Sequence, residues 1–249
     1  MTDNVLGIDV GGSSIKAARV DTTRGTVMGS MVSAPTPQPA SPTAVMAVLA
    51  ELAKGCADTS GRVGVAFPTV ITAGTARTAA NIDAAWLGTN GEALAARALG
   101  RPALFLNDAD AAGLAEMRFG SGRGCTGTVI MLTFGTGIGT ALFTGGKLFP
   151  NSELGHLPLH GMDAEKWASA QVRTAERLDF PAWIARVNEY LRALHDLLWP
   201  DVFILGGAVS ERFAEFAPLL RSPAELRPAH FAGQAGVIGA ALAAVAAAG

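Results

Sequence analysis

Short apolar runs that end at glycine alternate along the chain with longer stretches that have helical spacing. Apolar runs at 5–11, 15–20 and 27–32 are separated by turns that contain glycine, which predicts three consecutive strands. A run, a glycine turn and a hairpin recur at 128–148. Because this spacing exceeds the period of a solenoid, the recurrence predicts two related halves and not a repeat array.

Strands and helices alternate beyond these hairpins. Ser41 and Pro42 suit the N-cap and the first position of a helix. The further elements that we expect are strands at 62–67, 104–106 and 202–205 and helices at 43–56, 109–119, 182–199, 210–220 and from 232. This alternation is typical of an α/β fold with a mainly parallel sheet.

The composition is that of a globular protein whose charges nearly balance. The 249 residues are sufficient for one large domain or two modest ones, and 49% of them are hydrophobic. The formal net charge is −2, from 19 basic and 21 acidic residues. Because there is no basic excess, we expect neither nucleic acid nor a membrane surface as a partner.

The cysteines and the apolar segments bear on the cellular compartment. Cys56 and Cys125 are too far apart for a CxxC metal motif, and two cysteines give no disulfide framework. Residues 1–4 are polar, and the apolar stretch at 235–249 is shorter than the roughly 20 residues of a membrane-spanning helix. We therefore expect a cytoplasmic protein whose last segment is a packed helix.

The first glycine turn has the chemistry of a phosphate site. Asp9 ends the first predicted strand, and Gly11, Gly12 and Ser13 follow it. Backbone N–H groups of such a turn can hold phosphate oxygens, and a neighbouring carboxylate can bind Mg²⁺ directly or through water. Lys16 would add positive charge. A plain tight turn with an aspartate cap explains the same residues, so the motif alone leaves both interpretations open.

Two further glycine turns follow predicted strands. Gly206 and Gly207 come after the strand at 202–205, where a nucleotide could lie on the backbone or a helix could simply pack closely. The turn after 128–134 has more glycines than an ordinary hairpin requires, which favours phosphate binding. Its candidate residues are Thr133, Gly135, Thr136 and Gly137.

Polar side chains follow the strand predicted at 104–106. Asp108 or Asp110 could cap the helix that begins there, but a carboxylate at a strand end is also where a general base would lie. The local sequence does not decide between these roles. Asn81 shares a polar loop with Trp86, a combination found in sugar sites, although a solvated loop anchored by the tryptophan is the simpler interpretation.

Another polar segment follows the second hairpin. Glu153 and His156 are three residues apart and can face one ligand if the segment is helical. A zinc site would need another ligand, for which His160 and Asp163 are near enough in sequence. Glu165 begins a predicted helix, where an acidic side chain is favourable for the helix dipole alone.

In their order along the chain, these motifs resemble the ROK family of sugar kinases within the actin-like ATPase superfamily, and most closely its polyphosphate-using branch. The most specific segments are LNDADAAGLAEMRFG, TVIMLTFGTGIGTALF and PNSELGH. The resemblance implies duplicated ribonuclease H-like domains with a cleft between them. We expect a small domain at 1–110, a large domain at 111–232, and a helix at 233–249 that packs back on the small domain.

The resemblance also implies a role for each motif. Asp108 would be the general base that takes the proton of the glucose 6-hydroxyl. The three glycine turns and Lys16 would hold the phosphoryl donor, which would be inorganic polyphosphate or ATP, and Asp9 would hold Mg²⁺. The sugar would contact Asn81, Asn107, Glu153, His156 and Glu165.

The chain departs from the family pattern in the zinc motif, among other positions, and the resemblance leaves other functions open. The segment 157–164 lacks the cysteines of the zinc motif that many members carry, so we expect no structural zinc. Family members are generally dimeric, so we expect a homodimer. An ATP-dependent kinase for glucose, mannose or another hexose would need the same motifs. A sugar sensor is less favoured, since such regulators carry a helix-turn-helix before a strand that begins here at residue 5.

Overall fold

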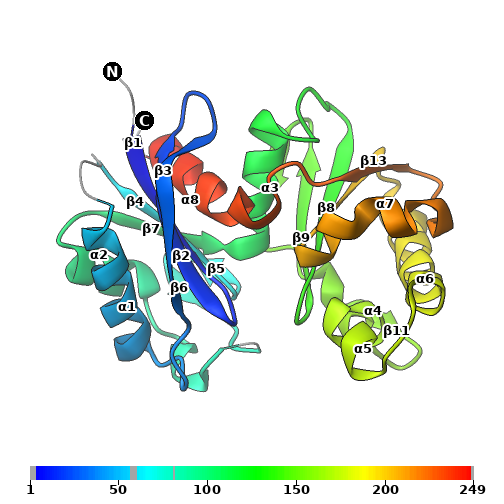
Figure 1. Ribbon diagram of the computed structural model, residues 1–249, viewed down its shortest axis with the longest axis horizontal. Helices are drawn as coiled ribbons and strands as arrows, with labels where there is room; N and C mark the ends of the chain where they lie inside the picture. Colours follow the sequence, from blue (N-terminus) through cyan, green and yellow to red (C-terminus); the bar gives the residue numbers. More distant parts are fainter. Residues whose placement is uncertain (1–3, 57–60, 81, 248–249) are drawn as a thin grey trace. The chain divides into compact units, whose positions relative to one another are not determined.

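The computed structural model describes residues 4–56, 61–80 and 82–247 of the protein (Figure 1). Its internal contacts divide the chain into two compact units. Unit 1 comprises Met1–Phe119 and Gln234–Gly249, and unit 2 comprises Gly120–Gly233. None of the helices in the described ranges combines the length and the apolar character that a membrane span requires.

Unit 1 contains a five-stranded sheet. Its strands are β1 (Asn4–Val10), β2 (Ser14–Asp21), β3 (Thr26–Pro35), β4 (Val63–Phe67) and β7 (Ala103–Asn107), and a small hairpin is formed by β5 (Ile71–Thr72) and β6 (Thr75–Ala76). In the order β3-β2-β1-β4-β7, the first three strands are an antiparallel meander, and β4 and β7 join parallel to β1. The carboxyl ends of β1, β4 and β7 therefore lie at one edge of the sheet.

Helices cover both faces of this sheet. They are α1 (Pro42–Lys54), the 3₁₀ turn η1 (Ala84–Trp86), α2 (Gly91–Leu99), α3 (Asp108–Phe119) and α8 (Ala235–Ala246), which follows the 3₁₀ turn η5 (Ala232–Gln234). On one face, Ile8 of β1 belongs to a core cluster with Leu49 of α1 and with Trp86 and Phe105. On the other face, α8 packs against β1, β4 and α3.

Helix α8 approaches its neighbours at glycines. The helix consists of small and apolar residues, most of which are buried. A methyl group at Gly64 of β4 would overlap the carbonyl oxygen of Ala240, and one at Gly239 would overlap the carbonyl oxygen of Ala111 in α3. Contact between backbones therefore fixes α8, and larger residues at these positions would prevent it.

The sheet of unit 2 repeats the arrangement of unit 1. Its strands are β8 (Thr128–Phe134), β9 (Ile138–Thr144), β10 (Lys147–Phe149), β13 (Val202–Gly206) and β14 (Glu225–Pro228). Strands β8 to β10 are an antiparallel meander, β13 lies parallel beside β8, and β14 lies parallel beside β13. The order β10-β9-β8-β13-β14 matches that of unit 1 strand for strand, which confirms the prediction of two related halves.

Short elements and one long helix complete unit 2. They are η2 (Leu154–His156), β11 (Pro158–Leu159), β12 (Met162–Asp163), α4 (Ala164–Ala168), α5 (Ala170–Ala175), α6 (Phe180–Leu198), η3 (Ala208–Arg212), α7 (Phe213–Phe216) and η4 (Ala217–Leu219). Asp179 caps α6, because its carboxylate accepts a hydrogen bond from the N–H of Ala182 at 2.9 Å. Trp183 and Tyr190 of α6 pack in the core with Phe134 and Phe203 of the sheet.

The helix predicted at 210–220 is wrong. The chain forms η3, α7 and η4 there, in three short pieces. Pro218, the second residue of the last piece, has no N–H to donate, so one continuous helix would lose a hydrogen bond and clash with its own backbone. Helix α2 was not predicted, although Asn90 caps its start and Gly100 ends it in the left-handed conformation.

We predict that Gly239→Ala destabilises the protein, because the added methyl group must displace α8 or the Ala111 carbonyl. Overpacking of this kind costs about 1–3 kcal/mol, which would lower the melting temperature measured by circular dichroism. Ala243→Ser, at a half-buried position of the same helix, is the control and should melt close to the wild type. Equal melting temperatures for Gly239→Ala and the wild type would contradict the packing described.

Candidate active site

In unit 1, an open glycine turn follows Asp9 at the carboxyl end of β1. The N–H of Gly11 donates to the carbonyl of Ser14 at 3.0 Å, which closes the turn. Gly12 and Ser13 are exposed, and the space beside the Gly12 α-carbon is open. The backbone of this turn is therefore accessible to a ligand, as a phosphate site requires.

The carboxylate of Asp9 lies against the first turn of α8. A methyl carbon at Gly236 would be 2.6 Å from Cγ of Asp9, so this position leaves room for nothing larger than glycine. Burial raises the pKa of Asp9 to about 6, while Lys16, its partner in the β1–β2 ladder, opposes that rise. Above this pH the side chain of Asp9 is ionised. Its carboxylate then lies beside an accessible turn and is suited to bind Mg²⁺.

A proline-rich segment is attached to the same turn. The Thr36 N–H donates to the carbonyl of Ser13 at 3.1 Å, and its hydroxyl donates to the carbonyl of Gly11 at 2.6 Å. A cavity of about 290 Å³ lies between the two segments, and its walls include Gly12, Gln38 and Asp83. Reasoning from the sequence did not place Thr36 or Gln38 at a site.

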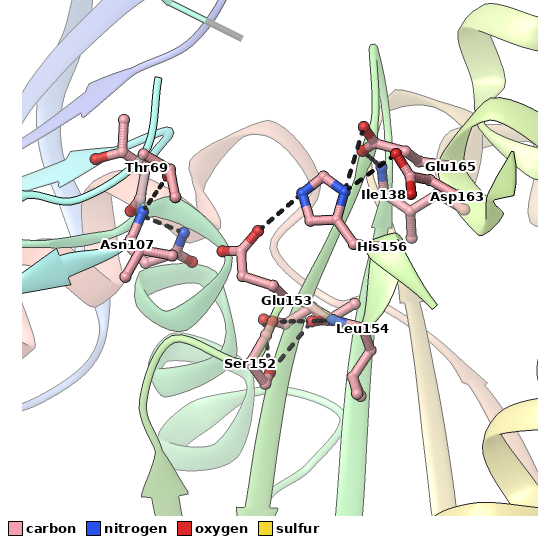
Figure 2. Close-up of polar contacts among 12 residues, drawn as sticks. Thr69, Asn107, Ile138, Ser152, Glu153, Leu154, His156, Asp163 and Glu165 are labelled. Carbon is pink, nitrogen blue, oxygen red and sulfur yellow. Dashed lines mark hydrogen bonds and ion pairs between the residues drawn. The ribbon is translucent and has the colours of Figure 1, made fainter. Parts of the chain in front are cut away.

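Asn107 and Asp108 stand where β7 runs into α3. The Asn107 Oδ1 accepts a hydrogen bond from the N–H of Asp110 at 3.0 Å, and its Nδ2 donates to the carbonyl of Thr69 at 3.2 Å (Figure 2). Asn107 therefore caps α3, a role for which the sequence had also offered Asp108 and Asp110. A capping side chain belongs to the residue just before the helix, because from there it can accept from the N–H of the third helical residue. Asn107 has that position, since α3 begins at Asp108. Asp108 is half-buried, and Asn81 lies outside the described residues.

In unit 2, Thr140 of β9 fastens the segment that carries Glu153. Its carbonyl accepts from the Ser152 hydroxyl at 3.1 Å, and its hydroxyl accepts from the N–H of Leu154 at 3.1 Å and also contacts the Ser152 carbonyl. Gly155 lies against the carbonyl of Ile138. These contacts hold the backbone, while the side chains of Glu153 and His156 remain exposed.

The imidazole of His156 lies between carboxylates. Its Nε2 is 3.4 Å from Oε2 of Glu153, and its Nδ1 is 3.6 Å from Oδ2 of Asp163 and 4.0 Å from Oε1 of Glu165 (Figure 2). The other Glu165 oxygen accepts from the N–H of Ile138 at 3.3 Å. The side chain of Glu153 is 40% exposed, and the loss of water around the rest of it raises the pKa of its carboxyl group, an effect that His156 opposes and Glu165 increases. The cluster offers several acceptors and a titratable donor, which suits a ligand rich in hydroxyls.

Among the described residues, this cluster around His156 is also a place that could hold a metal ion. One ligand atom from each of His156, Asp163 and Glu165 lies within 4.8 Å of the others. His160, which the sequence placed among the candidate ligands, instead pairs with Glu189 at 2.8 Å. The predicted absence of structural zinc remains a prediction.

The second and third glycine turns come together in unit 2. The N–H of Gly135 donates to the carbonyl of Gly137 at 3.0 Å, and Gly135 and Thr136 are exposed. Thr133 is the register partner of Gly206 in the β8–β13 pair. Gly207 has φ of +86° and packs on the backbone of Phe134, where a methyl group would overlap the carbonyl oxygen. Both turns therefore lie at the carboxyl ends of adjacent strands, as β1 and its turn do in unit 1.

Two units with this shared strand order, each with a glycine turn after its first strand, have the actin-like ATPase fold. Within that class the chain belongs to the ROK family, whose profile matches residues 5–169.

Known relatives cover nearly the whole chain. Polyphosphate glucokinase from Mycobacterium tuberculosis is 44% identical over 242 residues, which are 97% of this chain and 91% of the relative. An inorganic polyphosphate/ATP-glucomannokinase from Arthrobacter sp. strain KM, known from a crystal structure, has 41% sequence identity to this chain and a TM-score of 0.95. The match covers 98% of this chain and 99% of the Arthrobacter chain. A ROK family glucokinase from Streptomyces griseus, solved in complex with glucose and AMPPNP, shares the fold, with 24% sequence identity and a TM-score of 0.80. The match covers 96% of this chain and 98% of the Streptomyces chain.

We predict that Asp9→Asn stabilises the ligand-free protein above pH 6. The pKa of Asp9 in the folded protein is above its ordinary value of 3.8, so the folded state binds this proton more tightly than the unfolded state. The wild type therefore loses stability as the pH rises from about 4 to about 6, and the variant lacks this loss.

Melting temperatures of both proteins, measured in EDTA at pH 5 and pH 8, check this. The gain in the variant should be larger at pH 8. A gain that is equal at the two pH values, or smaller at pH 8, would show that Asp9 does not carry a raised pKa.

Proposed function

We propose that this protein transfers a phosphoryl group from inorganic polyphosphate to the 6-hydroxyl of glucose. The observation that carries the proposal is the 44% identity, over 97% of the chain, with a relative named polyphosphate glucokinase. The Arthrobacter relative, named for polyphosphate and ATP as donors, supports the same chemistry.

The proposed sugar contacts are polar side chains with hydrogen-bonding groups to spare. Glu153, His156 and Glu165 supply acceptors and a donor that suit the hydroxyls of a sugar. Asn107 uses one Nδ2 hydrogen for the Thr69 carbonyl, and the other can be donated to a hydroxyl. Asn81 is proposed as a sugar contact on the resemblance alone.

Asp108 would act as the general base. As the 6-oxygen of glucose attacks the terminal phosphorus, the bond from that phosphorus to the bridging oxygen breaks and the shortened polyphosphate leaves. The hydroxyl proton passes to the Asp108 carboxylate, a step typically worth about 10²- to 10⁴-fold in rate. Asn107 caps α3, and Oδ1 of Asp108 accepts a hydrogen bond from the N–H of Ala109 at 2.8 Å, which holds the proposed base at the start of the helix.

Each glycine turn is proposed as a contact for the phosphoryl donor. In unit 1, residues 11–13 expose backbone that could hold phosphate. In unit 2, the turn with Thr133, Gly135, Thr136 and Gly137 does the same, and Gly206 and Gly207 lie beside it. Mg²⁺ held by Asp9 would neutralise charge on the donor. Backbone N–H groups hold phosphate without a large basic surface, which agrees with the net charge of −2; Lys16 would add one positive charge.

The Arthrobacter relative also supports a wider specificity. Its name includes ATP as a donor and joins glucose with mannose as acceptors. We therefore propose ATP as a second donor, and mannose as the first alternative sugar to test. The homodimer, the cytoplasmic location and the domain boundaries remain predictions from the sequence and the resemblance.

A coupled assay for glucose 6-phosphate tests the proposal. Purified protein, glucose and Mg²⁺ would be incubated with polyphosphate, with ATP or with no donor. We expect turnover with polyphosphate and none without a donor. Turnover with ATP but not with polyphosphate would overturn the proposed donor and leave the proposed sugar chemistry standing. No glucose 6-phosphate in any of the three reactions would overturn both.

A further inference from the structure

The segment between His156 and Glu165 is a very short hairpin. Strands β11 and β12 have two residues each, and His160 and Gly161 form the turn with φ values of 52° and 76°. Two-residue strands are too short to hold a hairpin in place by themselves. Strand β12 ends at Asp163 and leads directly into α4, whose first turn carries Glu165. The hairpin thus sets the position of two carboxylates that face His156.

One carboxylate of helix α6 joins this hairpin to α4. Oε2 of Glu189 lies 2.8 Å from Nε2 of His160 and accepts a hydrogen bond from Nε1 of Trp167 at 3.1 Å. His160 is the tip of the hairpin, and Trp167 is on α4 two residues after Glu165. The imidazole and indole rings also contact each other, with 4.7 Å between their centroids.

A second residue of α6 supports the same indole. The guanidinium carbon of Arg186 lies 4.1 Å from the centre of the Trp167 ring, and Nη1 donates to the Trp167 carbonyl at 3.2 Å. Nη2 of Arg186 pairs with Glu176 at 2.6 Å. Because Trp183 and Tyr190 of α6 are buried in the core of unit 2, the helix is held in place and can support α4.

We propose that Glu189 is a positioning residue for the sugar site: by binding the hairpin tip and Trp167, it fixes Asp163 and Glu165 opposite His156. This inference rests on the proposed function, in which Glu165 contacts glucose. Glu189 itself is in contact with His160 and Trp167 and belongs to none of the three glycine turns. Its loss should therefore weaken the binding of the sugar and spare the binding of the donor.

The test compares Glu189→Ala, Glu189→Gln and the wild type with glucose varied at saturating polyphosphate, and then with polyphosphate varied. A misplacement near 1 Å is costly, so we expect the glucose KM of Glu189→Ala to rise about tenfold. Its kcat and its KM for polyphosphate should stay within about twofold of the wild type. The glucose KM of Glu189→Gln should stay close to that of the wild type, because the amide oxygen of glutamine still accepts a hydrogen bond from the indole N–H of Trp167.

Glu215→Ala is the matched control, since it removes an exposed glutamate of unit 2 that pairs with Arg212. This equally exposed pair lies within the short helices at 208–216 and does not include the hairpin or α4, so the kinetics of the control should match the wild type within about twofold. An unchanged glucose KM in Glu189→Ala, an equal rise in both KM values, or failure of the glutamine variant to restore binding would overturn the proposal.

Glucose affinity measured by calorimetry separates this inference from the function itself. If the wild type binds glucose but turns over no donor, the proposed reaction fails, and the affinities of the Glu189 variants still decide the positioning role. Absence of glucose binding by the wild type would overturn both.

Discussion

Helix α8 lies with its backbone against the backbones of β4 and α3, because glycines at 64 and 239 remove the side chains that would keep them apart. The rest of unit 1 depends on this contact. It brings the last helix of the chain onto the first strand, and it sets Gly236 against the carboxylate of Asp9. The group proposed to hold Mg²⁺ therefore takes its place and its raised pKa from tertiary packing, not from its own turn.

Unit 2 uses the same constraint at other positions. Gly207 rests on the backbone of Phe134, and Gly155 rests on that of Ile138. The first contact joins the ends of two parallel strands, and the second holds the segment of Glu153 and His156 against β9. In both units close backbone contact, together with a repeated strand order, places exposed turns and polar side chains at strand ends. Such turns bind phosphate through N–H groups and so need little net positive charge.

The parts of the fold that the sequence predicted are those with local signals. An apolar run that ends in glycine is visible without any structure, which is why β1, β8 and their turns were found. Residues that act across long separations gave no such signal. Thr140 holds Ser152 and Glu189 holds Trp167 across loops, and only the folded chain brings these partners together.

The roles of the candidate residues were likewise only partly accessible. Asp108 and Asp110 were the caps that the sequence suggested for α3, and the choice of Asn107 depends on backbone geometry that composition does not contain. His160 has the side chain of a metal ligand and lies near enough in sequence to join a zinc site with His156, but the hairpin turns it toward Glu189. Side-chain chemistry could be predicted, whereas direction could not.

The central claim is that Asp108 moves a proton and does not hold the sugar. The most direct measurement compares Asp108→Asn with the wild type by calorimetric titration of glucose and by turnover with polyphosphate. The account predicts glucose affinity within about threefold and a rate lower by about 10²- to 10⁴-fold, because only the base is lost. A variant that turns over at the wild-type rate, or one whose lost rate is fully explained by lost glucose binding, would contradict it.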